Sequence, residues 1–244
     1  MTAAVRIVLI DPSHPGNIGS VARAMKNMSL EDLVLVRPRS FPHPDSEALA
    51  AGADDILKRA RVVDDVRAAV ADCGFVAGTT SRPRNLNWDF LTPRDLAARV
   101  QVLPPETRAA LLFGSERYGL ANDDLQICHV LVRIPANAAY CSLNLAMSVQ
   151  LIAYELFVAR HATGSVLQLE RPLASGEQME LLFAHLQKAM DHVGFEDRNG
   201  EGHLMTRLRR LFNRAQLDQN EINILRGLFT AIEGARRPAQ PRQR

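Results

Sequence analysis

The sequence predicts an α/β protein in which a parallel-sheet domain is followed by a small all-helical domain. Short apolar runs alternate with helical stretches from Val5 to Arg160, which is the pattern of units that build a parallel sheet. Beyond residue 176 the apolar residues recur only at helical spacing. With 244 residues and 47% hydrophobic content, the chain can bury a sizeable core, so general disorder is excluded.

The elements of the first domain follow from apolar runs and turn signals. Strands are predicted at residues 6–10, 33–36, 62–63, 75–78, 109–113 and 130–134. Helices are predicted at residues 18–27, 45–53, 66–73, 93–100 and 143–160. Residues 82–92, which contain the only tryptophan, are polar and predicted to be irregular.

The helix predicted over residues 143–160 is the most unusual element. It is apolar on nearly every face, so it must be buried in the core or against a partner subunit. Ser142 is predicted as its N-cap, because a serine hydroxyl can accept a free N–H of the first turn. Asn144 then falls in the first turn, where backbone N–H groups can hold a small polar ligand. A plain capped core helix is the alternative.

Composition shifts divide the chain into four parts. The sheet domain is assigned to residues 1–162, and a linker with Gly and Pro pairs to residues 163–176. A helical domain follows at residues 177–234, with helices predicted at 177–193, 204–215 and 220–232. The basic tail, residues 235–244, is predicted to be disordered.

The totals exclude several classes of protein. The net charge of +2 gives no global argument for a nucleic-acid partner. Three cysteines without C-x-x-C spacing argue against a disulfide framework or a zinc site, and the histidines form no metal-binding motif, so no metal is expected. The start lacks a signal-peptide pattern, and polar residues break the longest apolar run. A soluble, cytoplasmic protein without a membrane partner is therefore expected.

Candidate ligand loops follow several predicted strands. The Pro15–Gly19 loop, Pro-Gly-Asn-Ile-Gly, is typical of a plain turn or of a phosphate cradle, although it lacks a dinucleotide fingerprint. Arg23 lies one turn further on, without an acid four residues away on either side, and is either a solvated charge or a phosphate fork. Glu116 follows another strand, as a surface turn residue or as a ligand for a ribose hydroxyl or a cation. Loops at the carboxyl ends of parallel strands favour a shared pocket.

The tail carries an uninterrupted basic window. Arg207, Arg209, Arg210 and Arg214 fall between Leu204 and Gln216, where there is no acidic residue. A solvated face of an amphipathic helix is the ordinary explanation. Arginines without interleaved acids are also a local footprint for RNA or DNA.

Three motifs in order resemble those of SPOUT-class RNA ribose 2′-O-methyltransferases. They are His14-Pro-Gly-Asn-Ile-Gly-Ser-Val-Ala-Arg-Ala-Met, Leu112-Phe-Gly-Ser-Glu-Arg-Tyr-Gly-Leu, and Ile134-Pro-Ala-Asn followed by Cys141-Ser-Leu-Asn-Leu-Ala-Met. The helical tail, with Leu208-Arg-Arg-Leu-Phe-Asn-Arg-Ala, resembles that of the TrmJ type. The resemblance covers almost the whole chain, and Cys141 is a conservative departure where a small residue such as Ser is expected.

This resemblance implies a C-terminal trefoil knot in the sheet domain, S-adenosylmethionine held in that knot, a homodimer, and tRNA as substrate. The implied reaction is 2′-O-methylation of cytidine or uridine at nucleotide 32 of the anticodon loop, without a metal. The residues implied to carry or support catalysis are Asn17, Arg23, Glu116, Ser142 and Asn144. Those implied to bind the cofactor are Thr79, Thr80, Ser81, Gly114, Ile134, Cys141, Ser142 and Leu143. Those expected to contact RNA are Arg23, Arg207, Arg209, Arg210 and Arg214.

Arg23 is expected to grip the phosphate beside the target ribose rather than to act as a base, because a guanidinium does not release its proton near neutral pH. Other functions stay open. One is methylation of a different tRNA or rRNA site, and another is a non-catalytic RNA-binding protein on the same fold. A nucleotide-dependent metabolic enzyme is disfavoured, because no G-x-G-x-x-G follows Ile10.

Overall fold

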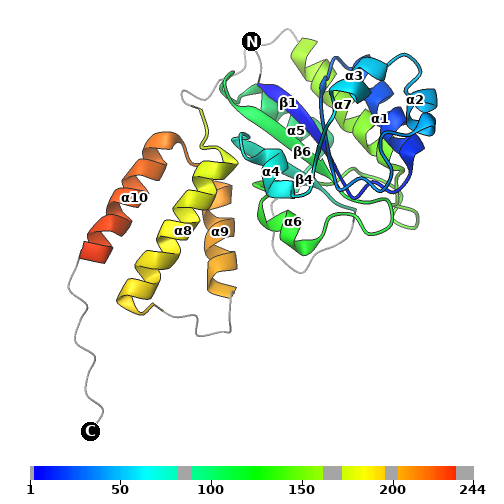
Figure 1. The fold of residues 1–244 in the computed structure, drawn as a ribbon. Coiled ribbons are helices and arrows are strands. Elements are labelled where there is room, and N and C mark those ends of the chain that lie inside the picture. Colours follow the sequence, from blue (N-terminus) through cyan, green and yellow to red (C-terminus); the bar gives the residue numbers. More distant parts are fainter. Residues whose placement is uncertain (1–2, 82–89, 162–171, 196–202, 235–244) are drawn as a thin grey trace.

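The computed structural model of the chain describes residues 3–81, 90–161, 172–195 and 203–234. Three predictions therefore lie outside the described residues: the irregular segment around Trp88, most of the linker, and the basic tail 235–244. Figure 1 shows the two parts of the molecule, a sheet covered by helices and a group of three helices beside it.

Parallel strands form one seven-stranded sheet in the described residues, in the order β3-β2-β1-β6-β4-β7-β5. The strands are β1 (Ala4–Ile10), β2 (Asp32–Val36), β3 (Arg61–Val63), β4 (Phe75–Thr79), β5 (Phe90–Leu91), β6 (Arg108–Phe113) and β7 (Val130–Val132). The parallel sheet is as predicted, with all six predicted strands present. β5 was missed, because two residues pairing with Leu131 and Val132 at the sheet edge carry no periodic pattern.

Helices cover both faces of the sheet (Figure 1). They are α1 (Pro15–Asn27), α2 (Pro44–Ala50), α3 (Asp54–Arg59), α4 (Val66–Val70), α5 (Pro93–Gln101), α6 (Asn122–Gln126) and α7 (Leu145–His161). Alternation along β1 shows the two faces: Ile7 and Leu9 belong to the core under α1, α5 and α7, while Val8 and Ile10 belong to the core under α4 and α6.

Two helix predictions need correction in this domain. The helix predicted over residues 45–53 ends earlier, at Ala50, because Ala51 and Gly52 adopt φ angles of +47° and +91° and end α2. The next helix, α3, lies just beyond the predicted span and was not predicted. The short helix α6 was not predicted. Its five residues are too few to produce a helical period.

The helical part comprises α8 (Gly176–Val193), α9 (His203–Ala215) and α10 (Gln219–Gly234), which share a core of their own. α8 begins one residue before its predicted start, with Ser175 and Gln178 forming a capping box. Its first amides meet the α4–β4 turn: Gly176 N donates to Cys73 O at 2.8 Å, and Glu177 N donates to Ala71 O at 3.0 Å. No helix of the described residues is long and apolar enough to cross a membrane.

The predicted apolar face of α9 is partly wrong. Leu208 and Phe212 pack against the helical core as expected, but Leu211 is 48% exposed. The buried residue is Asn213, whose Nδ2 donates to the backbone oxygen of Gln126 at 3.0 Å. α9 therefore packs against both the helical core and α6, which its sequence period does not reveal.

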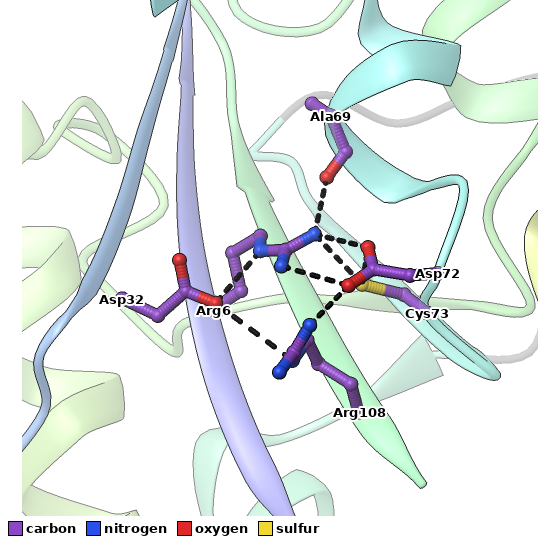
Figure 2. Close-up of polar contacts among 6 residues, drawn as sticks. All are labelled: Arg6, Asp32, Ala69, Asp72, Cys73 and Arg108. Atoms are coloured by element: carbon purple, nitrogen blue, oxygen red, sulfur yellow. Dashed lines mark hydrogen bonds and ion pairs between the residues drawn. The ribbon is translucent and has the colours of Figure 1, made fainter. Parts of the chain in front are cut away.

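An ion cluster around the buried Arg6 lies where β1, β2 and β6 begin (Figure 2). Arg6 is 3% exposed and donates to Asp72 at 2.5 and 3.1 Å and to Asp32 at 2.8 Å. Arg108 pairs with the same Asp72. Burial raises the pKa of Asp72, but the hydrogen bond from Arg6 outweighs it, and the pKa falls well below its usual range. The cluster thereby holds the turn that receives α8.

Candidate active site

A cavity of about 300 Å³ lies at the carboxyl ends of β4, β6 and β7. Sheets of this kind bind ligands at that edge. Every residue to which the resemblance gave a cofactor role lines it: Thr79, Thr80, Ser81, Gly114, Ile134, Cys141, Ser142 and Leu143. The structure thus brings together three segments that are far apart in the sequence, around residues 79–81, 114 and 134–143.

Glu116 is the centre of a hydrogen-bond network beside this cavity. Its carboxylate accepts four bonds from the segment that follows β1. The donors are Ser13 N at 2.9 Å, Ser13 Oγ at 2.8 Å, His14 N at 3.2 Å and Asn17 Nδ2 at 2.9 Å. Partial burial raises the pKa of Glu116, but the bonds from Asn17 and Ser13 outweigh it, and the pKa falls to about 2. Glu116 is therefore a fixed anion near neutral pH.

Asn17 extends this network to the third motif. Its Oδ1 accepts a hydrogen bond from Asn144 Nδ2 at 3.0 Å, while its Nδ2 donates to Glu116. The chain Glu116–Asn17–Asn144 therefore connects all three motifs noted in the sequence. Ser13 was missed as a member, although its place just after a strand, in a turn-rich segment, was an available signal.

The start of α7 corrects a sequence prediction. Ser142 is not the N-cap, because the helix begins at Leu145. Asn144 caps it instead: its Oδ1 accepts from Ala146 N at 2.8 Å and from Met147 N at 3.4 Å. Asparagine caps helices as well as serine does, so composition could not separate the two. The consequence is that Ser142 lies free of the helix, on the cavity wall.

The Pro15–Gly19 segment is not a plain turn. It forms the beginning of α1, which starts at Pro15 rather than at the predicted Ile18. Proline is well suited to the first helical position. Gly19 lets α2 approach: a Cβ added to it would lie 2.1 Å from the backbone oxygen of Ser46.

Close packing also requires glycine at position 114. A Cβ on this residue would lie 2.0 Å from the backbone carbon of Gly119, because the loop folds back on itself. Gly119 N donates to Ser115 O at 2.8 Å and closes this turn. The loop therefore presents main chain to the cavity at close range.

The predicted arginines are placed in different environments. Arg23 is an exposed residue of α1, does not line the cavity, and has no side-chain hydrogen bond or ion pair with the described residues. Arg207 and Arg214 are exposed on α9. Arg209 makes contacts within the helical part: its guanidinium donates to Glu180 at 2.7 and 3.0 Å and lies 4.3 Å from the centre of the Phe183 ring.

Comparison with known proteins defines the class first. Residues 4–154, which contain the sheet and the cavity, match the model of the SpoU rRNA Methylase family. The fold is therefore that of a SpoU-type methylase. Residues 177–244 match the model described as tRNA methyltransferase TrmJ, C-terminal domain.

Full-length relatives give the particular family. The tRNA (cytidine/uridine-2′-O-)-methyltransferase TrmJ of Sodalis glossinidius is 46% identical over 97% of this chain and 94% of its own. The tRNA (cytidine/uridine/adenosine-2′-O-)-methyltransferase TrmJ of Pseudomonas aeruginosa is 43% identical, over 96% and 95%. The crystal structure of TrmJ from Z. mobilis ZM4 superposes with a TM-score of 0.82 at 35% identity, covering 95% of this chain and all of that one. The chain belongs to the TrmJ family of tRNA methyltransferases.

Proposed function

We propose that this protein methylates the ribose 2′-hydroxyl of cytidine and uridine in tRNA, with S-adenosylmethionine as methyl donor. The observation that carries the proposal is the Glu116–Asn17–Asn144 chain, which joins three motifs beside one cavity in a member of the TrmJ family. By resemblance, the target is nucleotide 32 of the anticodon loop. The name of the Pseudomonas relative adds adenosine to the nucleosides worth testing.

The cavity has the character that this cofactor requires. Its volume lies at the lower end of the range for small-molecule sites. Phe113, Ile134 and Leu145 supply apolar walls for a ring, while hydroxyls and loop backbone supply polar partners. Residues 79–81, 114, 134 and 141–143 would hold the cofactor, which supplies, when bound, a methyl group on a positively charged sulfur.

In this proposal Glu116 is a positioning residue rather than a base. A carboxylate with a pKa of about 2 that already accepts four hydrogen bonds has little capacity to take a proton. Its role is to fix the segment after β1 against the loop after β6. Asn17 and Asn144 pass this constraint on to the residues before α7, and Ser142 presents its hydroxyl at the cavity wall.

Arg23 is proposed to hold the phosphate next to the target ribose. An exposed guanidinium that has no side-chain partner in the part of the chain that the structure describes is available for a two-pronged contact with phosphate. Such a contact aligns the ribose hydroxyl and stabilises the negative charge that develops on its oxygen. A guanidinium has a pKa above about 12, so this role does not require it to act as a base.

We propose that the active protein is a homodimer formed through α7. The buried side of this helix packs against α1 and α5, but its other side exposes an apolar stripe. Met147, Leu151, Tyr154 and Val158 are 62%, 43%, 51% and 43% exposed, at spacings of four, three and four residues. Covering this stripe with a second copy would remove it from water. Arg23 does not line its own cavity, and we propose that it serves that of the partner.

The trefoil knot is also part of the proposal. It is supported by the convergence of the segments after β4, β6 and β7 on one cavity, immediately before α7. A knot at this position would make the cofactor loops mutually supporting.

The helical part is proposed to be a separate tRNA-binding domain, residues 177–234, joined to the sheet domain 1–162 by the linker 163–176. Its own core supports this division. Arg207, Arg210 and Arg214 fall on one face of α9 and would contact phosphates. Arg209 is left out of this RNA-binding face, because its guanidinium already pairs with Glu180.

The test is methylation by the purified protein. We expect unmodified tRNA incubated with S-adenosylmethionine to yield 2′-O-methylcytidine or 2′-O-methyluridine, detected by nucleoside mass spectrometry and mapped by digestion to nucleotide 32. Asn144→Ala should lose most of this activity, and Arg23→Lys should restore little of what Arg23→Ala removes, since an ammonium cannot make the bidentate contact.

Each rival function predicts another result. Methylation of rRNA fragments but not of tRNA would identify an rRNA enzyme. Binding of tRNA without cofactor binding, measured by calorimetry, would identify a non-catalytic RNA-binding protein.

A further inference from the structure

A second cavity, of about 320 Å³, lies between the sheet domain and the helical part. We call it the seam cavity. Its walls include Val70, Val76 and Ile127 from the first part, and Met179 and Phe183 from α8. Figure 1 shows α4 and α6 facing α8 and α9 across this boundary. The seam cavity is separate from the candidate active site, with which it shares no lining residue.

His129 places a hydrogen-bond donor at the seam cavity. The side chain is 6% exposed, and its Nδ1 accepts a hydrogen bond from Val76 N at 2.9 Å. A neutral imidazole that accepts at Nδ1 carries its proton on Nε2. Burial lowers the pKa of His129 to about 4, so this neutral form persists near neutral pH. Nε2 has no partner among the described residues, and it lies on the ring edge away from the bond to Val76.

Asn213 adds an acceptor from the other side of the boundary. It is 4% exposed, lines the same cavity, and uses Nδ2 to bond the backbone oxygen of Gln126. Its Oδ1 has no partner within the described ranges. Neither His129 Nε2 nor Asn213 Oδ1 is among the fully buried side-chain atoms that lack a partner in the described residues, so both atoms keep accessible surface although their side chains are almost completely buried. A donor and an acceptor, one from each part of the chain, can therefore be reached from the seam cavity.

We propose that the seam cavity binds a small aromatic heterocycle that accepts a hydrogen bond from His129 Nε2 and donates one to Asn213 Oδ1. The apolar walls and the ring of Phe183 favour a flat apolar body, and the two polar groups favour ring nitrogens over a hydrocarbon. Because the ligand would touch both parts of the chain, its binding would stabilise their docking. The proposal does not depend on the methylation reaction.

The test uses two probes of equal size on the full-length protein. Benzimidazole has one ring acceptor and one N–H, whereas indene has neither. Saturating S-adenosylhomocysteine should be present to block the candidate active site. We expect benzimidazole to raise Tm and to shift the His129 Nε2–H signal in NMR spectra, and indene to bind at least about tenfold more weakly.

Variants separate a specific site from a simple gap. His129→Asn can keep an acceptor for Val76 N while removing the Nε2 donor, and should weaken benzimidazole about tenfold without affecting indene. His43→Asn, at the half-buried cap of α2 and away from the seam cavity, is the matched control. If His129→Asn does not fold, Ala68→Leu narrows the seam cavity from its lining and should abolish binding of both probes. Equal affinity for both probes, unchanged binding in these cavity variants, or no binding to the native protein would overturn the proposal.

Discussion

Glu116 and Arg6 show two uses of a buried or half-buried charge. Glu116 lies at the carboxyl edge of the sheet and draws several backbone and side-chain donors onto one carboxylate. Arg6 lies where the strands begin and is shared between Asp32 and Asp72. Each charge joins segments distant in sequence, so removing one partner should cost more than an exposed ion pair would. Glu116 holds the segment after β1 against the loop after β6, and Arg6 holds the turn that contacts the start of α8.

The Glu116→Gln variant should bind the cofactor at least about tenfold more weakly, because an amide nitrogen would face donors that now have an acceptor. Calorimetric titration with S-adenosylhomocysteine measures this effect. Glu106→Gln makes the same chemical change at an exposed carboxylate and should leave the affinity unchanged. Equal affinities for the two variants would show that the network does not shape the cavity.

His129 should make the protein sensitive to mild acid. Its pKa is lowered from 6.5 to about 4 in the folded chain, so between these values the unfolded chain binds a proton that the folded chain does not. The contribution is fully present above pH 6.5 and is lost as the pH falls towards 4, by up to about 3 kcal/mol. Urea unfolding at about pH 7.5 and about pH 4.5 measures it.

The His129→Asn variant should lose less stability than the native protein over the same pH interval, whatever its stability at neutral pH. The same substitution at the half-buried His43, His43→Asn, should follow the native curve. Parallel pH dependences for the native protein and His129→Asn would contradict the assignment.

Close contacts between helices are the part of the fold that could not be predicted from the sequence. The parallel sheet and the main helices could be predicted, because apolar runs and helical periods are local signals. The start of α1 was placed at Ile18 instead of Pro15, because the Pro and Gly residues of this segment are locally typical of a turn. The need for Gly19 arises from the backbone of α2, some 27 residues away, which no local pattern encodes. The N-cap of α7 was misplaced for a similar reason, because Ser142 and Asn144 are both good cap residues. The hydrogen bond between Asn17 and Asn144, two residues distant in the sequence, holds Asn144 at the cap position.

Two glycine-to-alanine variants should therefore act in opposite directions. Gly19→Ala should lower the free energy of unfolding by about 1–3 kcal/mol, because α2 has to move away. Gly227→Ala, where an added Cβ meets nothing within 4 Å in α10, should raise it by about 0.5–1 kcal/mol. Chemical denaturation measures both. A neutral Gly19→Ala would mean that α1 and α2 can separate at little cost.

Neighbouring arginines of α9 should also behave differently. Arg214→Gln should weaken tRNA binding and reduce the salt dependence of log Kd by about 0.7–0.9, the contribution of one phosphate contact. Arg209→Gln should leave this slope unchanged but lower Tm, because Glu180 and the ring of Phe183 lose their partner. Filter binding over a salt series and thermal unfolding distinguish the two roles. A changed slope for Arg209→Gln would place that residue on the RNA after all.

At the scale of the whole molecule, the sequence was least informative about how distant parts of the chain meet at a site. The motif residues around the cavity could be named by resemblance, and a role for Arg23 in the partner's pocket could be put forward as a hypothesis, but only the structure shows that Arg23 does not line its own cavity. The seam cavity carries no sequence signal either, since its walls come from helices that meet only in the folded chain.

Mixing subunits tests the assembly directly. If Arg23 serves the partner's cavity, inactive Arg23→Ala and inactive Asn144→Ala proteins should recover up to about a quarter of native activity after mixing and re-equilibration. Half of the dimers would be mixed, each with one complete site. Tritium transfer to tRNA measures the recovery, and light scattering checks the dimer. An active monomer would refute the dimer, and no recovery from mixed dimers would assign Arg23 to its own subunit.

The contact between the start of α8 and the α4–β4 turn has a consequence for how such proteins can diverge in evolution. The first amides of this helix hold carbonyl oxygens of Ala71 and Cys73, and carbonyls are present whatever the side chains are. Substitutions in that turn are therefore tolerated as long as its length and its contacts with Arg6 are kept. A helical domain attached in this way can be exchanged between related catalytic domains by recombination, and a chimera joined at residue 172 is a natural starting point for testing whether this domain selects the RNA.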